Sequence, residues 1–376
     1  MNFRNLYLFL ITLKNIFVIN ILIAVYKIKK KKIIIFYHPK KDLEKISTYY
    51  INSLLKFPKK KNFKVIILNN SSNQFFLNNY IIQYFLKFIW GVDIFLSNYV
   101  CDFFPYRCKK IYMHHDIYDT PVSGHKREKA LFERFQKYDF MLIPSVKSKF
   151  VFNKLKLNYN KSKIELKIIG YYKLDYLKKK FYKKKKHKNL KNIIIAPTNY
   201  YSFPNMSLIE SVEKIIKKIL KKTNLNIIFR PHPSNFNDPK TFYIKDKFSK
   251  NKRFIFDKSN NYFETYASSK CLITDLSGTA YTYSFLTNRP TIFFSNYESI
   301  LKKLKYDKLN YFKDRNKIGY VIKDLNNLIK TLNNKTDHKN KSENIIKMSL
   351  SIFKIGSSKY LFKKFIDEII WLKNRI

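Results

Sequence analysis

Short runs of β-branched and aromatic residues alternate with longer helical stretches along most of this chain, and that alternation constrains its fold more than any other feature. Strands separated by helices form parallel sheets, with the crossover helices packed on both faces. The pattern therefore predicts an α/β protein with two doubly wound parallel sheets that face each other across a cleft. Ligands of such sheets bind at the carboxyl ends of the strands.

The expected elements fall into two halves. In the first half the expected strands are Lys32–Tyr37, Phe63–Leu68, Val92–Ser97, Lys110–His114, Phe140–Pro144 and Ile164–Gly170. In the second half they are Asn192–Ala196, Leu225–Phe229, Arg253–Phe256, Lys270–Thr274, Pro290–Phe294 and Gly319–Ile322. Helical patterns cover Lys41–Phe57, Lys126–Lys137, Ser207–Lys222 and Lys359–Lys373. In the third of these, apolar residues recur at helical spacing, so one face should be buried.

A dense basic segment, residues 177–191, separates the two halves. Like charges at this density repel one another, so we expect a solvated helix or linker there. The predicted organisation is then an apolar N-terminal segment (1–31), a Rossmann-like domain (32–176), the basic linker, a second Rossmann-like domain (192–345) and C-terminal helices (346–376).

The formal charge of +49 indicates either an anionic partner or compositional drift, and the sequence leaves both open. Only nine of the 75 basic residues are Arg, and Lys is a solvated point charge rather than a bidentate reader of phosphates and bases. An anionic membrane surface is therefore favoured over nucleic acid, for which no known motif is visible. The 45% hydrophobic content excludes intrinsic disorder, and three cysteines exclude a disulfide scaffold.

The N-terminal run, residues 6–26, supports the membrane interpretation. It is long enough to span a bilayer, but Lys14 near its middle is costly there. Five lysines follow at Lys27 and 29–32, and they would hold the downstream chain on the cytoplasmic side. No small-x-small site suggests a cleaved signal peptide. A spanning anchor, an interfacial helix and an ordinary packed helix all remain open.

The segment Cys271–Phe294 predicts a phosphate site. A buried strand ends at Asp275, and the small residues Ser277, Gly278 and Thr279 open the next helix. A helix start offers free N–H groups and a positive dipole end to a phosphate. The alternative is that Asp275 or Ser277 merely caps the helix.

The segment Ile227–Ser234 places Arg230 and His232 directly after another strand, between stiffening prolines. Arg230 could neutralise a phosphoryl oxygen, and His232 could hydrogen-bond it or donate a proton. Local loop bonds are the alternative for both. Thr198, after the strand Asn192–Ala196, is a further candidate at the same kind of position.

The segment Ile111–Pro121 contains His114, His115 and Asp116 at the end of a strand in the first half. A histidine beside a carboxylate is the usual general-base arrangement. A purely structural role is the main alternative. A metal site is disfavoured, because no spaced third ligand is evident, and no cofactor is expected. Neighbours on a strand face opposite ways, so which histidine faces the cleft stays open.

Taken in order, the segments HHDIYDTP, GYYKLD, APT, RPHP and TDLSG resemble the CDP-glycerol glycerophosphotransferase family, the polymerases and primases of teichoic-acid-type polymers. The resemblance covers roughly residues 105–295. It implies a GT-B fold, with acceptor and donor domains, and transfer of a polyol phosphate from a CDP-activated donor to a hydroxyl of a polymer or lipid-linked acceptor, releasing CMP. It also implies a location at the cytoplasmic face of the membrane.

The resemblance further implies that His115, or His114, is the catalytic base, that His232 contacts the donor phosphates, and that Ser277 and Thr279 grip the pyrophosphate. Three positions depart from the family pattern: Asp116 replaces a Gly, Gly278 replaces a Ser, and GYYKLD lacks a Pro-Arg pair. The donor therefore stays open between glycerol, ribitol, another polyol and a sugar nucleotide. The alternatives are a GT-B glycosyltransferase for capsule or lipopolysaccharide, and a non-catalytic polybasic binder of membranes or nucleic acid.

Overall fold

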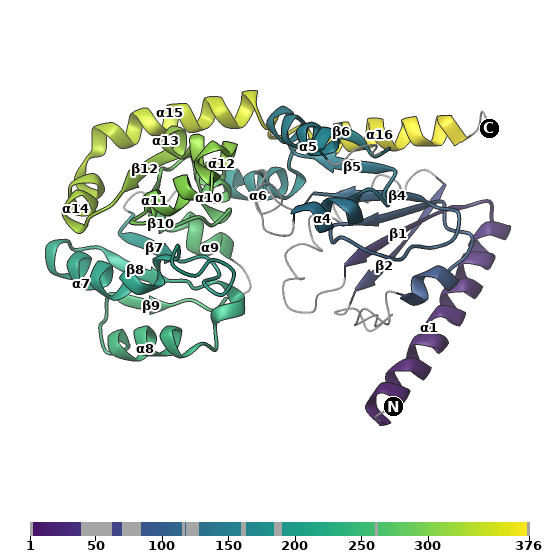
Figure 1. Ribbon diagram of the computed structural model, residues 1–376, viewed down its shortest axis with the longest axis horizontal. Helices are drawn as coiled ribbons and strands as arrows, with labels where there is room; N and C mark the ends of the chain where they lie inside the picture. The colour runs from purple at the N-terminus through teal and green to yellow at the C-terminus, as the bar shows by residue number, and fades with distance from the viewer. Residues whose placement is uncertain are drawn as a thin grey trace. The chain divides into compact units, whose positions relative to one another are not determined.

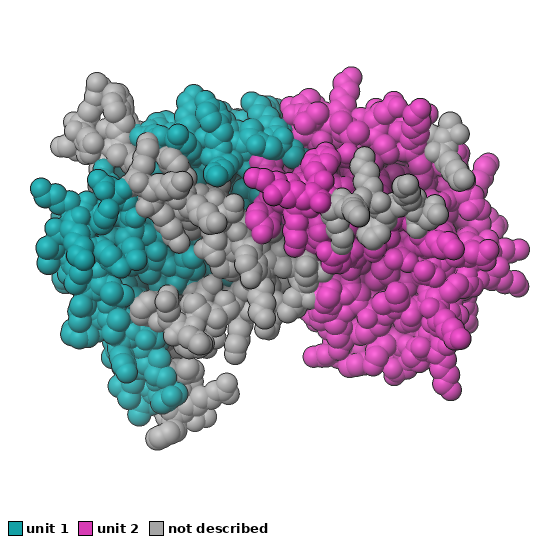
Figure 2. Space-filling view, turned by 180° about the vertical axis from the view of Figure 1, so that it is seen from behind, with its two compact units in different colours: residues 1–116, 121–173, 354–376 teal, residues 117–120, 174–353 magenta. Residues whose placement is uncertain are grey.

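The computed structural model describes residues 3–38, 62–69, 84–114, 117, 128–158, 163–183, 190–259 and 262–373. The chain divides into two compact units (Figure 2). Unit 1 comprises residues 1–116, 121–173 and 354–376, and unit 2 comprises residues 117–120 and 174–353. The predicted helix Lys41–Phe57 lies outside the described residues.

Unit 1 is built on a parallel sheet of six strands in the order β2-β1-β3-β4-β5-β6 (Figure 1). The strands are β1 (Lys32–His38), β2 (Phe63–Asn69), β3 (Ile94–Ser97), β4 (Lys109–Met113), β5 (Phe140–Ile143) and β6 (Glu165–Ile168). The helices of the described part are α1 (Phe3–Ile28), η1 (Phe85–Phe88), α4 (Glu128–Phe135), α5 (Val146–Asn158) and α16 (Ser358–Lys373). Each predicted strand is present, with ends moved by at most a few residues.

Unit 2 repeats this plan in the order β12-β11-β10-β7-β8-β9, again with every strand parallel. Its strands are β7 (Asn192–Ala196), β8 (Asn226–Phe229), β9 (Phe254–Phe256), β10 (Ser269–Thr274), β11 (Thr291–Phe294) and β12 (Gly319–Ile322). Its helices are η2 (Leu208–Ser211), α7 (Val212–Lys222), η3 (Pro233–Asn235), α8 (Pro239–Phe248), α9 (Tyr262–Ala267), α10 (Thr279–Thr287), α11 (Glu298–Lys303), η4 (Tyr306–Lys308), α12 (Asn310–Lys313), α13 (Arg315–Ile318), α14 (Leu325–Asn333) and α15 (Lys335–Ser351). The predicted α/β architecture of two doubly wound sheets is confirmed.

Apolar packing explains why these elements form. The strands β1, β3, β5, β7, β10 and β11 are buried on both faces, as their continuous apolar runs require, whereas the edge strands β6, β9 and β12 are partly exposed. On η2 and α7, the residues expected on one apolar face are all buried: Ile209, Val212, Ile215, Ile216 and Ile219. That face belongs to the core of unit 2.

Each sheet has one switch point, where the strand order reverses direction. In unit 1 it lies between β1 and β3, and in unit 2 between β7 and β10. The loops that leave the carboxyl ends of two such neighbouring strands run apart and leave a crevice for a ligand. The switch points therefore mark where a site is expected in each unit.

The basic segment 177–191 is partly helical, because α6 (Tyr172–Lys183) continues into it. Leu177 and Lys178 are buried, and the Lys178 ammonium donates to the Phe285 carbonyl at 2.8 Å and to the Asn288 side chain at 3.1 Å. Lys178 thus departs from the expectation of a solvated segment, because it binds the carboxyl end of α10, where a cation is favoured by the helix dipole.

Candidate active site

Three neighbouring strands of unit 2 bring the predicted donor-site residues to one edge of the sheet. Strand β7 lies between β8 and β10, with Ala196 opposite Thr274 and Ile195 opposite Phe229. Because all three strands are parallel, the segments that follow them leave from the same edge. These segments carry Thr198 after β7, Arg230 and His232 after β8, and Asp275, Ser277, Gly278 and Thr279 after β10.

Asp275 spans the switch point of unit 2. Its side chain is fully buried, and its carboxylate accepts hydrogen bonds from the backbone N–H groups of Thr198 at 3.0 Å and Leu208 at 2.7 Å. It also accepts from the N–H of Leu276. Burial raises the pKa of Asp275 to about 6, while these N–H groups act in the opposite direction. Asp275 therefore joins the loop after β7 to the end of β10.

The N-terminus of α10 is held by two tyrosines. The Tyr311 hydroxyl donates to the Ser277 carbonyl at 2.7 Å, and the Tyr266 hydroxyl is hydrogen-bonded to the Thr279 hydroxyl. Both tyrosine rings are buried, whereas Ser277, Gly278 and Thr279 are half-buried. Gly278 is the N-cap, and Ser277 accepts the first N–H groups of the helix: its hydroxyl accepts the Thr279 N–H at 3.4 Å and its carbonyl accepts the Ala280 N–H at 3.1 Å. The site is rigid and suited to an anion.

Arg230 is already occupied by protein partners. Its guanidinium forms an ion pair with Asp257 at 2.6 Å and donates to the Ser259 carbonyl at 2.8 Å, with both charged side chains nearly buried. The Thr265 hydroxyl also donates to Asp257 at 2.7 Å. Although burial opposes it, hydrogen bonds from Ser259 and Thr265 and the charge of Arg230 lower the pKa of Asp257. Arg230 thereby ties the loop after β8 to the loop after β9.

His232 has a defined tautomer. It caps η3, and its Nδ1 accepts the backbone N–H of Ser234 at 3.2 Å. A nitrogen that accepts carries no proton, so in the neutral ring the proton is on Nε2. The half-buried ring can then donate through Nε2 to an oxygen of a phosphate.

In unit 1, the structure describes one of the two adjacent histidines, His114. The buried His114 ring packs edge-on against Phe152, at a centroid distance of 5.3 Å, and against Tyr112 on the same strand face. Its backbone N–H extends the ladder to Leu142. His115 and Asp116 lie outside the described residues.

A polar pair that the sequence did not reveal sits at the switch point of unit 1. The buried His38, last residue of β1, donates from Nδ1 to the side-chain oxygen of Asn98, which follows β3, at 2.8 Å. The Tyr99 ring stands edge-on to His38 at 5.1 Å. His38 ends an apolar run and precedes no motif, so only its position at a strand end could have indicated it.

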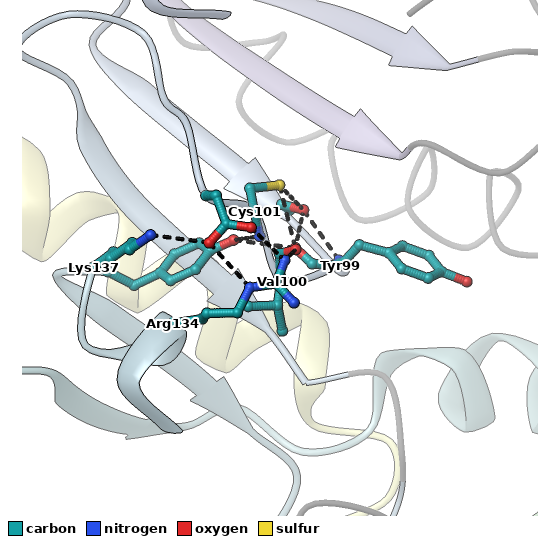
Figure 3. Close-up of polar contacts among 8 residues, drawn as sticks. Tyr99, Val100, Cys101, Arg134 and Lys137 are labelled. Carbon is teal, nitrogen blue, oxygen red and sulfur yellow. Dashed lines mark hydrogen bonds and ion pairs between the residues drawn. The ribbon is translucent and has the colours of Figure 1, made fainter. Parts of the chain in front are cut away.

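The loop after β3 is braced by residues from the region of α4 (Figure 3). The Tyr138 hydroxyl accepts the Cys101 N–H at 2.8 Å and donates to the Tyr99 carbonyl at 3.1 Å. Arg134 and Lys137 both bind the Asp102 carboxylate, at 2.8 and 2.9 Å. Figure 3 shows the Tyr99 side chain pointing away from this network. The brace thus fixes the backbone that carries Asn98 and Tyr99.

Among the residues that the structure describes, no three His, Cys, Asp or Glu side chains gather as a metal ion would require. The groups that could hold a ligand at the edge of unit 2 are instead donors: the His232 ring, the α10 N-terminus and its hydroxyls. Donors of this kind suit a phosphate-bearing substrate.

Similar folds occur among solved structures. The wall teichoic acid polymerase TagF is 18% identical, with a TM-score of 0.60 and 100% of each chain covered. An S. aureus MnaA–UDP complex is 12% identical, with a TM-score of 0.60, covering 92% of this chain and 98% of that one. A putative UDP-N-acetylglucosamine 2-epimerase from Listeria monocytogenes is 11% identical, with a TM-score of 0.59 and the same coverage. At these identities the likeness shows the fold, which is GT-B.

No curated protein sequence matches the chain. The family model for CDP-glycerol:poly(glycerophosphate) glycerophosphotransferase, however, matches residues 111–355, which is more than half of the 376 residues. That stretch contains HHDIYDTP, GYYKLD, APT, RPHP and TDLSG, the segments on which the resemblance was founded. The match confirms the resemblance: the chain belongs to the CDP-glycerol:poly(glycerophosphate) glycerophosphotransferase family and is an enzyme of that kind.

Proposed function

We propose that this enzyme takes glycerol phosphate from CDP-glycerol and attaches it to a hydroxyl of a growing polyol-phosphate polymer, releasing CMP. One observation carries the proposal. Groups that can bind a phosphate follow β8 and β10, the two strands that flank β7, at the carboxyl edge of unit 2 and beside its switch point.

The donor pyrophosphate is placed at the N-terminus of α10. The positive dipole end of this helix would attract its charge, the hydroxyl of Ser277 would donate to its oxygens, and His232 would donate to it from Nε2. Asp275 and Arg230 do not contact the donor in this proposal. They fix the loops that carry Thr198 and His232, which positions the donor for transfer.

The reaction is an in-line substitution at phosphorus. His115 removes the proton of the acceptor hydroxyl, and the acceptor oxygen forms a bond to the phosphorus that bears the glycerol. The bond from that phosphorus to the oxygen bridging to the CMP phosphate breaks, and CMP leaves with the electron pair. The donors at α10 and His232 stabilise the negative charge that develops on the leaving group.

The acceptor approaches the carboxyl edge of unit 1. Asn98 and Tyr99 stand there on the braced loop after β3. The enzyme acts at the cytoplasmic face of the membrane in this proposal, because the apolar N-terminal helix is followed by a lysine cluster at 29–32.

The test follows CMP release from CDP-glycerol, with an acceptor-containing membrane extract. His232→Ala should lower the rate at least 100-fold, because one donor to the leaving group is lost, and should lower the melting temperature only slightly, because the cap of η3 is lost as well. His338→Ala is the matched control, since His338 binds the Thr331 carbonyl away from the sheet edge and should keep its rate.

If the wild-type enzyme releases CMP only from another CDP-polyol, the proposed donor is wrong but the proposed reaction stands. Release of nucleotide only from a sugar nucleotide would overturn the proposal in favour of a glycosyltransferase. Full activity of His232→Ala would overturn the placement of the donor.

A further inference from the structure

The helix α1 is built into unit 1 along one face only. Its buried residues Thr12, Ile16, Ile19 and Ile23 recur at intervals of four, three and four, which is one stripe of a helix. The three isoleucines belong to the hydrophobic core of unit 1. Figure 1 shows α1, in purple, running beside the strands of that unit.

Polar contacts fasten the same face. The Asn20 side chain donates to the Phe88 carbonyl at 2.8 Å and accepts the Trp90 N–H at 3.0 Å. The Lys27 ammonium pairs with Asp93 at 2.6 Å, near the carboxyl end of the helix. A helix that crossed a bilayer along its length would lose these partners and leave Asn20 in hydrocarbon, which costs several kcal/mol for an unsatisfied amide.

The opposite face of α1 is apolar and exposed. Phe17 is 68% exposed and Ile28 is 82% exposed. The other large apolar side chains on this face are Leu6, Tyr7, Phe9, Leu10, Leu13, Val18, Ile21 and Val25. The Phe9–Ile28 stretch has a mean hydropathy of 2.0, yet only 22% of it is buried. An exposed apolar surface of this length marks an interaction site.

Aromatic side chains extend this surface onto η1. Phe85 of η1 packs edge-on against Phe9 at 5.4 Å. Next to it Tyr84, Phe88 and Trp90 are exposed, the last at 65%. Tyrosine and tryptophan are the residues that gather at the level of lipid headgroups. We call the outer face of α1 together with Tyr84, Phe88 and Trp90 the α1–η1 surface.

The positive charge around the α1–η1 surface favours anionic lipid as its binding partner. Residues 1–32 contain no Asp or Glu, and Lys14, Lys29 and Lys30 are exposed on or beside the helix. Lys87 lies over the Tyr84 ring at 4.5 Å. Lys14 lies within the apolar strip, between Leu10 and Phe17 at helical spacing, and its long side chain can reach the headgroups, while Lys29 and Lys30 lie at the end of the strip. Such a strip fits the boundary between acyl chains and anionic headgroups, where a helix lies flat.

We propose that α1 lies in the plane of an anionic membrane, with the α1–η1 surface in the headgroup–acyl boundary and the opposite face in the core of unit 1. The proposal deepens the membrane location given under Proposed function and rests on it. It makes the helix a structural part of unit 1 rather than a spanning anchor.

The first test is sedimentation of the purified full chain with vesicles of phosphatidylglycerol and phosphatidylcholine. Phe17→Asp with Ile21→Asp should weaken binding at least tenfold, and binding should fall again in pure phosphatidylcholine. Phe150→Asp is the matched control, because Phe150 is 70% exposed on α5 but lies outside the α1–η1 surface. Unchanged binding of the double variant, or an equal loss in the control, would overturn the proposal.

If the double variant melts at a lower temperature, Lys29→Glu with Lys30→Glu gives an independent reading. Both lysines are exposed, and their reversal should remove most of the dependence on anionic lipid. Binding that ignores both this change and lipid charge would contradict the proposal. A stable dimer in the absence of vesicles that dissociates in the double aspartate variant would also contradict the proposal, because a second copy of the chain would then cover the α1–η1 surface.

A depth measurement separates a flat helix from a spanning one. Fluorescent labels on Leu6→Cys, Phe17→Cys and Ile28→Cys should show one shallow depth with lipid-bound quenchers. A label at residue 17 that lies much deeper than the other two would establish a spanning helix.

The proposed reaction is tested apart from this placement. The double aspartate variant should release CMP from CDP-glycerol at the wild-type rate with a detergent-solubilised acceptor. A wild-type protein that binds vesicles but releases no CMP would refute the reaction and leave the membrane placement standing.

Discussion

The two sheets share one topology, yet they hold their sites in different ways. In unit 2, one buried carboxylate, Asp275, collects backbone N–H groups from both sides of the switch point. In unit 1, the loop after β3 is held by several weaker contacts spread over Tyr138, Arg134 and Lys137. A single buried acceptor makes a site rigid but vulnerable to one substitution, whereas a distributed brace tolerates the loss of one member.

The largest effects should come from the two adjacent histidines of unit 1. His115→Ala should slow CMP release by roughly 10²–10⁴-fold with an unchanged melting temperature, because a general base is lost. His114→Ala should instead lower the melting temperature, since it removes a ring packed against Phe152. The measurements are the rate of CMP release and the melting temperature of both variants. A His114→Ala variant that is slow but melts normally, beside a His115→Ala variant that is active, would make His114 the base.

Asp275→Asn should be the most destabilising single change at the edge of unit 2. The new amide would face the N–H groups of Thr198 and Leu208 and lower the free energy of unfolding by about 2–4 kcal/mol. Urea unfolding measures it, and Asp246→Asn, at an exposed position, should change little. If both variants lost the same free energy of unfolding, Asp275 would not be what holds the loops at the switch point together.

The same carboxyl gives a pH dependence. Burial raises the pKa of Asp275 to about 6, above its value in the unfolded chain. The folded chain therefore holds a proton between about pH 4 and 6 that the unfolded chain releases, so this contribution to stability is lost as pH rises through that window. Asp275→Asn should lack that slope in urea titrations.

Lys178 should produce the opposite slope. Burial lowers the pKa of Lys178 to about 8, whereas the unfolded chain keeps its lysines protonated to about pH 10. Stability should therefore rise with pH between about 8 and 10, by up to roughly 2–3 kcal/mol relative to Lys178→Met. If the difference in stability between the wild-type protein and Lys178→Met stayed constant between about pH 8 and 10, the Lys178 ammonium would not be desolvated.

The smallest effect is expected in the brace of unit 1. Asp102→Asn should lower the free energy of unfolding by about 1 kcal/mol, because its partners Arg134 and Lys137 are half-exposed. Although burial opposes it, hydrogen bonds from Lys137 and Arg134 lower the pKa of Asp102, so the difference should vanish as pH falls below about 4. A loss as large as that of Asp275→Asn would abolish the contrast between the two units.

The sequence predicted the sheets, and it predicted that the candidate residues follow strand ends, because both depend on local pattern. Strand runs carry their own periodicity, and Asp275, Ser277 and Thr279 stand within five residues of one another. The partners of the predicted residues were hidden by distance along the chain. Asp257 stands 27 residues from Arg230, and Asn98 stands 60 residues from His38. No local pattern signals such pairs, so the structure was needed to assign Arg230 to its ion pair.

The N-terminal helix shows a second limit. Its composition is compatible with a helix that spans the membrane, one that lies on the membrane surface and one that packs within the protein. Hydropathy does not record which face of the helix is already buried against the protein. Three buried isoleucines and the two hydrogen bonds of Asn20 supply that missing information.

The buried cysteines make the chain well suited to labelling. Cys101, Cys108 and Cys271 all lie in the interior, and burial raises the pKa of Cys101 to about 11 and that of Cys271 to about 12. Because the thiolate is the reactive form, these two thiols react very slowly with maleimides near neutral pH. A cysteine introduced on the surface can therefore carry a probe in the otherwise native sequence.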